Sequence, residues 1–197
     1  MSNAEQELLQ RAIHGDDEAF GGLVEMYQNP VYNLCYRMLG DSQSAEDAAQ
    51  ESFWKAYQAL KKYDSQRSFI TWLLSITAHH CIDQQRKRRV IVTEMDDIFE
   101  ETFADSAPLP EKELIKTADQ SAVQAMLQML NETERAAIIM RYWYKYSEEE
   151  ISKSLNLSVS AVKSRLFRAR QKLANHWNDP TIIQKSEERM QDESPAF

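Results

Sequence analysis

The segment from residue 146 to residue 170 constrains the fold most, because its apolar residues form two short helical stripes separated by a turn. Ile151 and Leu155 lie four residues apart on the first stripe, and Leu157 falls in the turn. The second stripe repeats with the spacing i, i+4, i+7 and i+11 and contains Val162, Leu166, Ala169 and Leu173. Each predicted helix therefore has one face that packs inward. The pattern predicts a helix-turn-helix.

The second of these helices is strongly basic. Ser158 is its expected N-cap, and residues 163–172 contain five cations and no carboxylate. Small polar residues at its start, Ser160 and Ser164, would let the backbone approach bases while the cations meet phosphates. The alternative is a solvated amphipathic helix, but such helices normally mix both signs of charge. The pattern favours DNA binding.

Charge is unevenly distributed along the chain. The 197 residues have a net charge of −8, and residues 1–60 contain ten acidic against three basic residues. A second basic cluster, Arg-Lys-Arg-Arg, occupies residues 86–89. Net acidity therefore does not exclude nucleic acid, although it argues against indiscriminate binding. It also suggests that an acidic surface faces a basic protein partner.

Several classes of site are not predicted. Cys35 and Cys81 are too few for a disulfide framework or a zinc site, and we expect buried thiols in a reducing cytoplasm. The adjacent His79 and His80 point apart on a helix, so we expect no metal and no cofactor. Nucleophile–base sets and a glycine-rich phosphate loop are missing, which argues against an enzyme. With no signal peptide and no apolar run of membrane-spanning length, a soluble cytoplasmic protein is expected, without membrane insertion.

Helical periodicity dominates the rest of the chain, which has only four glycines and five prolines. We therefore predict an all-α fold with two small helical domains joined by a flexible acidic linker, the C-terminal domain being the helix-turn-helix. The linker is inferred because residues 90–111 carry seven acidic residues and no lysine or arginine. The expected divisions are a first domain at 1–92, the linker at 93–119, a second domain at 120–178 and a polar tail at 179–197.

One predicted helix carries an unusual outer face. Asp41 or Ser42 can cap this helix, and its apolar positions pack inward. The opposite face places Trp54 beside two carboxylates, Asp47 and Glu51, and beside Gln50. A tryptophan in that position either tucks under a neighbouring loop or docks a partner, and the sequence leaves both alternatives open.

Several segments together resemble a known family. They are Gln-Glu-Ser-Phe at 50–53, Phe-Ile-Thr-Trp-Leu at 69–73, Ile-Thr-Ala at 76–78, Cys-Ile-Asp at 81–83, Arg-Lys-Arg-Arg at 86–89, Leu-Asn-Glu-Thr-Glu-Arg at 130–135, Ser-Glu-Glu-Glu-Ile at 147–151 and Val-Lys-Ser-Arg-Leu-Phe-Arg-Ala-Arg at 162–170. In this order and spacing, over roughly residues 8–177, the chain resembles the bacterial RNA polymerase sigma factors of the extracytoplasmic-function (ECF) group.

The resemblance implies a promoter-specificity subunit whose partners are core RNA polymerase, promoter DNA and an anti-sigma protein. It implies minus-thirty-five contacts at Ser160, Ala161, Lys163, Ser164, Arg165, Phe167, Arg168 and Lys172. The implied minus-ten set, which includes a loop that holds a flipped base, is Tyr63, Asp64, Ser65, Gln66, Phe69, Trp72, His80, Arg86, Lys87, Arg88 and Arg89. The implied polymerase-docking face is Asp47, Gln50, Glu51 and Trp54.

Two points stay open at this stage. Many relatives have asparagine where this chain has His80, so the base preference there is not predicted. The rival interpretation is a helix-turn-helix regulator that binds an operator and senses a ligand through its N-terminal domain. Such regulators usually dimerise on a palindrome, whereas no dimer seam is evident here and each half of the chain has its own basic cluster.

Overall fold

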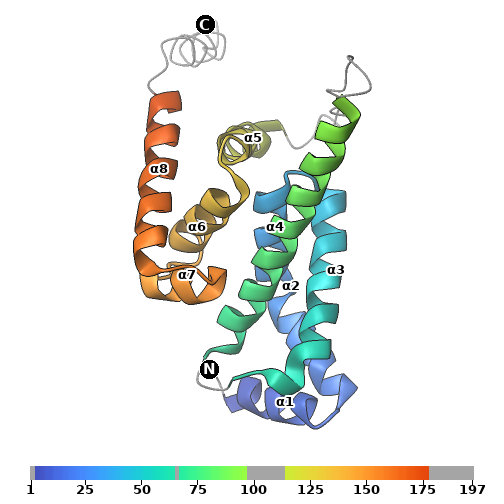
Figure 1. Ribbon diagram of the computed structural model, residues 1–197. Coiled ribbons are helices and arrows are strands. Elements are labelled where there is room, and N and C mark those ends of the chain that lie inside the picture. Colours follow the sequence, from blue (N-terminus) through green and yellow to red (C-terminus); the bar gives the residue numbers. More distant parts are fainter. Residues whose placement is uncertain (1–2, 65–66, 97–113, 178–197) are drawn as a thin grey trace, which may run out of the picture.

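The computed structural model describes residues 3–64, 67–96 and 114–177, and all regular structure within these ranges is helical (Figure 1). The helices are α1 (Asn3–Ile13), α2 (Asp17–Leu39), α3 (Ser42–Ala59), the short 3-10 helix η1 (Leu60–Lys62), α4 (Phe69–Asp96), α5 (Leu114–Gln128), α6 (Glu132–Tyr142), α7 (Glu148–Leu155) and α8 (Val159–Trp177). The all-α prediction is confirmed. None of the described helices is long and apolar enough to cross a membrane.

Helices α1–α4 form the first bundle, and local capping sets where α2 and α3 begin and end. The Asp16 side chain accepts from the Ala19 amide at 3.0 Å, and Asp41 accepts from the Ser44 amide at 2.7 Å. Gly40 ends α2 with φ of 98°, a left-handed conformation that favours glycine. The tight turn from Gly40 to Asp41 places α3 antiparallel to α2. Asp41 is therefore the cap that the sequence offered as one of two candidates.

Helix α2 contains a proline, Pro30, in its interior. The apolar pattern restarts at Pro30, yet α2 continues through this residue without a break. The expected burial of the thiols is confirmed, since Cys35 and Cys81 are fully buried. Their sulfur atoms lie 3.8 Å apart between α2 and α4. The hydrogen bond that the two thiols share, together with burial, raises the pKa of Cys35. Both buried cysteines pack as small apolar core side chains.

Helices α5–α8 form the second bundle, which contains the predicted helix-turn-helix. Ser147 and Glu150 form a reciprocal capping box at the start of α7. Asn156 ends α7 with φ of 52°, and the Ser158 hydroxyl then accepts from the Ala161 amide at 3.2 Å to cap α8. These three local devices reverse the chain within a few residues, so that α7 and α8 pack together as the sequence predicts.

The helices extend into both ends of the expected linker. Helix α4 continues to Asp96 and α5 begins at Leu114, so residues 93–96 and 114–119 are helical. The centre of the linker, residues 97–113, lies outside the described residues, as does the expected tail from residue 179 onward. The acidic composition that indicated the linker does not prevent helix formation where the chain adjoins a packed bundle.

The two bundles pack directly against each other. Helix α4 of the first bundle contacts α6 and α7, and α2 contacts α5 and α6. Figure 1 shows α5–α8 on one side of α2 and α4, and α3 on the other. Helix α3 therefore keeps a free outer face, whereas one side of α4 is covered by the helix-turn-helix.

Candidate nucleic-acid interface

The outer face of α8 is formed as the helical wheel predicts. Val162, Leu166 and Ala169 are buried against the other helices of the second bundle. Ser160, Ser164 and the 63% exposed Phe167 lie on the opposite side. This face presents small polar residues near the helix N-terminus and one aromatic ring further along. It is a surface that a DNA groove can approach closely.

Two of the cations on α8 are held by one buried carboxylate. Glu134 on α6 is only 2% exposed, and its oxygens lie 2.7 Å from Lys172 Nζ and 3.4 Å from Arg168 Nε. Burial alone would raise the pKa of Glu134, but the hydrogen bond and charge of Lys172, a hydrogen bond from the Asn131 backbone and one from Arg168 lower it overall. The carboxylate therefore stays ionised and fixes the direction of both half-exposed cations.

The remaining predicted α8 residues differ in how firmly they are held. Lys163 Nζ lies 3.5 Å from a carboxylate oxygen of Glu148 on α7, and both groups are partly open to solvent. Arg165 donates to the Ala161 carbonyl at 3.3 Å, so its side chain lies along its own helix. Ala161 itself is half-buried. Lys163 and Arg165 flank the outer face, and their contact with phosphates stays a prediction.

In the first bundle the predicted minus-ten aromatics form a cluster. The ring centroids of Tyr63 and Trp72 are 5.2 Å apart, those of Phe69 and Trp72 5.6 Å, and those of Tyr27 and Phe69 5.6 Å. Phe69 lies at the centre of the cluster and is fully buried, so it cannot contact a base here. That part of the expectation is corrected. Phe69 supports the half-exposed Tyr63 and Trp72, because periodicity alone does not separate a packed aromatic from an exposed one.

The expected base-holding loop begins beside this cluster. The Tyr63 hydroxyl donates to the Arg67 carbonyl, which closes the loop at its base. Asp64 is exposed, and Ser65 and Gln66 lie outside the described residues. The structure therefore shows where this loop leaves the bundle, next to Trp72, and its inner residues remain a prediction.

The described side chains of the basic cluster on α4 differ in their contacts. Arg86 and Lys87 are exposed, and neither forms an ion pair within the described residues. Arg88 instead turns toward the α2–α3 corner, where it donates to the Ser44 hydroxyl at 2.8 Å and lies 4.0 Å from the Asp41 carboxylate. The helix is described at Arg89, but its side chain is not. Arg86 and Lys87 are therefore the exposed cations of this cluster that form no ion pair among the described side chains, and their contact with DNA stays a prediction.

His80 is tied to α3. Its Nδ1 accepts a hydrogen bond from Lys55 Nζ at 2.7 Å, and Lys55 lies 3.8 Å from Glu51. Burial and the neighbouring Lys55 charge lower the pKa of His80, so the ring is neutral near pH 7. Within this arrangement only Nε2 remains as a donor for another group. Contact with the minus-ten element stays a prediction for this half-buried residue.

The expected docking face is exposed on α3. Asp47, Gln50, Glu51 and Trp54 all lie on the solvent side, and Trp54 is 55% exposed. The indole stacks on Tyr57 with ring centroids 5.8 Å apart rather than tucking under a loop. Gln50, Trp54 and Tyr57 line a shallow hollow of about 410 Å³ together with residues of α2. The alternative in which a loop covers Trp54 is therefore wrong, and the docking role stays a prediction.

The sequence did not predict that two neighbouring charged residues of α6, Glu134 and Arg135, are buried. Glu134 organises the cations of α8, and Arg135 is only 5% exposed at the junction of the two bundles. Both follow the Asn131 cap in the first turns of α6. A charged residue in the first turn of a helix is normally exposed to solvent. The only sequence signal for the burial of Glu134 and Arg135 is the apolar residues that surround them in α6.

Comparison with known proteins agrees with this arrangement. Residues 23–90 match the family described as Sigma-70 region 2, and residues 120–173 match Sigma-70 region 4. The first match covers most of α2 and all of α3, and reaches the basic cluster of α4. The second contains most of α5, all of α6 and α7, and α8 as far as Leu173. The rival interpretation, in which the N-terminal half is a ligand sensor, is thereby set aside.

Relatives similar over most of their length are sigma factors. The chain is 35% identical over 173 residues to the ECF RNA polymerase sigma factor SigW of Bacillus subtilis, covering 84% of this chain and 92% of that protein. It is 33% identical to the RNA polymerase sigma-H factor of Pseudomonas aeruginosa, covering 85% and 90%. It is 34% identical to the ECF sigma-E factor of Escherichia coli, covering 87% and 93%.

Solved structures share the fold. CnrH, determined in complex with the cytosolic domain of CnrY, superposes with a TM-score of 0.67 at 24% identity, covering 90% of this chain and 99% of that one. The sigma factor RpoE of Bartonella quintana, in complex with the anti-sigma factor NepR, gives a TM-score of 0.61 at 23% identity, covering 82% and 98%. With the family matches and full-length relatives above, the chain belongs to the ECF group of RNA polymerase sigma factors, the subunits that direct core RNA polymerase to promoters for transcription initiation.

Proposed function

We propose that α8 reads the minus-thirty-five element with its outer face. The observation that carries this proposal is the solvent-facing surface of Ser160, Ser164 and Phe167, flanked by cations on a helix that contains no carboxylate of its own. Arg168 and Lys172 lie on the same flank and are aimed by Glu134. Base edges are contacted by the N-terminal and central residues and by Arg168, which lies nearer the groove floor, and phosphates by the other flanking cations.

The first bundle is proposed to read the minus-ten element. Tyr63 and Trp72 present half-exposed rings beside the start of the loop at residues 64–67, and bases of a separating strand stack on such rings. Arg86 and Lys87 extend this surface with two free cations on α4. Phe69 contributes by supporting the two rings from below, not by touching DNA.

The outer face of α3 is proposed to dock on core RNA polymerase. An exposed indole beside a hollow, on a helix that also exposes Asp47 and Glu51, has the chemistry of an interface anchor among acidic side chains. This face lies on the side of the first bundle away from the helix-turn-helix. Both DNA-reading surfaces can therefore remain accessible when α3 is covered.

We further propose that the chain works in the cytoplasm as a non-enzymatic specificity factor and is held by an anti-sigma protein. The support is the family itself, together with the two solved relatives, whose structures contain the cytosolic domain of CnrY and the anti-sigma factor NepR. Co-purification of the full chain with candidate inhibitors, with and without core polymerase as competitor, tests this partner class.

The decisive experiment is run-off transcription by core RNA polymerase and the full chain on a promoter library randomised at minus thirty-five. Wild type should give a defined sequence preference, and Arg168→Ala should change it at one or two positions. Lys153→Ala, an exposed cation on α7 away from the outer face of α8, is the matched control and should leave the preference unchanged. Identical preferences for wild type and for a combined Ser160, Ser164 and Arg168 variant would overturn the proposed docking of α8.

A further inference from the structure

Two adjacent histidines on α4 carry their hydrogens on opposite ring nitrogens. His79 Nδ1 lies 2.8 Å from the carbonyl oxygen of Ser75. A carbonyl only accepts, so Nδ1 of His79 carries the hydrogen, and Nε2 is the acceptor of the neutral ring. His80 Nδ1 lies 2.7 Å from Nζ of Lys55, and an ammonium only donates. Nδ1 of His80 therefore accepts, and the hydrogen of this ring is on Nε2.

Lys55, which imposes this state on His80, is itself held by a second contact. Its Nζ lies 3.8 Å from Oε1 of Glu51, one turn earlier on α3, and the lysine side chain is 42% exposed. A nearby carboxylate favours the charged form of the ammonium. Lys55 therefore bridges a carboxylate of its own helix and an imidazole of the next helix as a cation.

The charges around the His80 ring keep it neutral. Burial and the Lys55 charge lower the pKa of His80, and Lys87 on α4 adds to this effect. Glu51 and Asp83 act in the opposite direction without reversing it. A neutral imidazole has one donor and one acceptor nitrogen, and the acceptor is occupied by Lys55. The ring therefore offers a single donor, Nε2–H, to another molecule.

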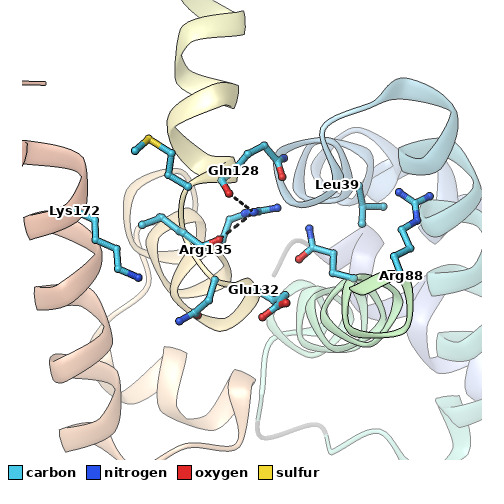
Figure 2. A pocket seen from close by; sticks show the side chains of 10 residues that line it. Leu39, Arg88, Gln128, Glu132, Arg135 and Lys172 are labelled. Atoms are coloured by element: carbon cyan, nitrogen blue, oxygen red, sulfur yellow. Dashed lines mark hydrogen bonds between the residues drawn. The ribbon is translucent and has the colours of Figure 1, made fainter. Parts of the chain in front are cut away.

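Arg88, a cation further along α4, does not compete for this ring. It lies two turns beyond His80, about 12 Å along the helix at 1.5 Å per residue. Figure 2 shows Arg88 at the edge of a cavity of about 480 Å³ between α4 and the second bundle. Its guanidinium donates to the Ser44 hydroxyl. Lys55 is therefore the cation that decides where the hydrogen of His80 lies.

A ring that can only donate discriminates between bases. On the edge that faces the major groove, guanine and thymine present a keto oxygen, whereas cytosine presents an amino group. The Nε2–H of His80 can donate to a keto oxygen, but an amino group would leave two donors facing each other. Adenine lies between these cases, because its N7 accepts beside its amino group. An asparagine in this position would differ, since its amide both donates and accepts and can pair with adenine.

We propose that Lys55 is a positioning residue for minus-ten recognition, which holds His80 as a hydrogen-bond donor and thereby selects a keto base over cytosine. The inference rests on the proposed reading of the minus-ten element by the first bundle, and it adds the class of base at one position. Lys55 acts through His80 and does not touch DNA itself. Base preference at this position is therefore set by a residue of α3 as well as by α4.

The position of the hydrogen is measured by nitrogen-15 NMR of the full-length chain at pH 7.5. Long-range proton–nitrogen correlations show which nitrogen of each histidine is protonated, and His79→Gln and His80→Asn assign the two rings. Nε2 should be protonated in His80 and Nδ1 in His79. Lys55→Met removes the donor and should give His80 a mixture of both forms, whereas Lys55→Arg, which also only donates, should keep the wild-type pattern. A protonated Nδ1 in wild-type His80 would overturn the proposal.

Base selection is measured by run-off transcription on a promoter library randomised in the minus-ten element. The position that His80 reads is the one at which His80→Asn changes the preference. There the wild type should favour guanine or thymine over cytosine on the order of tenfold. Lys55→Met should lose most of this preference, and Lys55→Arg should retain it. Lys61→Met, the same change at an exposed lysine of η1, is the matched control and should leave the preference unchanged.

A double variant separates positioning from direct contact. In the His80→Asn background, Lys55→Met should have no further effect on the preference. A further change in that background would show that Lys55 contacts DNA itself, and an unchanged preference in the single Lys55→Met variant would show that it does not set the selection. Either result would overturn the proposal. Absence of any minus-ten preference in the wild-type holoenzyme would instead overturn the proposed function, while the NMR result would stand.

Discussion

Lys172 Nζ lies 2.7 Å from Oε2 of Glu134, which joins the solvent-facing flank of α8 to the buried interior of α6. The carboxylate is 2% exposed, whereas the lysine is half-exposed. An ion pair with one buried member holds its exposed member in one direction, because the buried charge needs a partner. The stability of the second bundle and the direction of these two α8 cations are therefore coupled.

Replacing Glu134 with glutamine should lower the free energy of unfolding. The amide keeps the shape but removes the charge that Arg168 and Lys172 share, and both cations can rehydrate, so the expected loss is about 1–2 kcal/mol. Urea unfolding followed by circular dichroism measures it. Glu149→Gln, an exposed acid in the first turn of α7, is the control and should change stability by less than about 0.5 kcal/mol. Equal stability of the two variants would contradict the coupling.

Lys172→Ala should weaken binding to every promoter alike. A flank cation meets phosphate rather than base edges, so the slope of log affinity against log salt should become shallower by about one charge. Holoenzyme binding to two promoters with different minus-thirty-five sequences, titrated with salt, gives both quantities. A promoter-dependent loss would place Lys172 among the base-reading residues instead.

Two aromatic residues of the first bundle should respond in opposite ways. Phe69→Ala removes a fully buried ring and should cost about 3–5 kcal/mol of stability. Trp54→Ala removes a half-exposed ring and should cost less than about 1 kcal/mol, while weakening the affinity for core polymerase by at least about 2 kcal/mol as an interface anchor does. Thermal unfolding and core-binding titrations separate the two effects. Normal core affinity of the folded Trp54 variant would remove α3 from the docking face.

The lowered pKa of His80 predicts that the stability of the fold depends on pH. Its folded pKa is lowered by burial and by Lys55, so the unfolded chain binds the proton more readily. The stability that the neutral ring contributes is present above the unfolded pKa of about 6.5. It is lost as the pH falls from there toward the lower folded pKa. Urea midpoints at pH 7.5 and pH 5.5 should therefore differ more for wild type than for His80→Asn, and equal differences would show that His80 titrates freely.

Several features of the protein followed from local sequence signals alone. The Asp41 and Ser158 caps, the turn between α7 and α8 and the apolar stripe of α8 appear in the structure as predicted. The helical period also placed Trp54 on the outer face of α3, although it left open whether a loop covers the ring. Each depends on residues within one or two turns of each other, whose spacing decides helix boundaries and faces without knowledge of the remaining chain.

Tertiary structure alone decided which of these faces are covered and which charges are free. Phe69 and Trp72 lie three residues apart, yet Phe69 is buried against Tyr27 of α2 and against Tyr63, whereas Trp72 stays half-exposed. Glu134 meets Lys172 across 38 positions, and Arg135 meets Met38 across 97. Periodicity describes one helix at a time, whereas the burial of a side chain and the pairing of a charge depend on the surface that a distant helix brings against it.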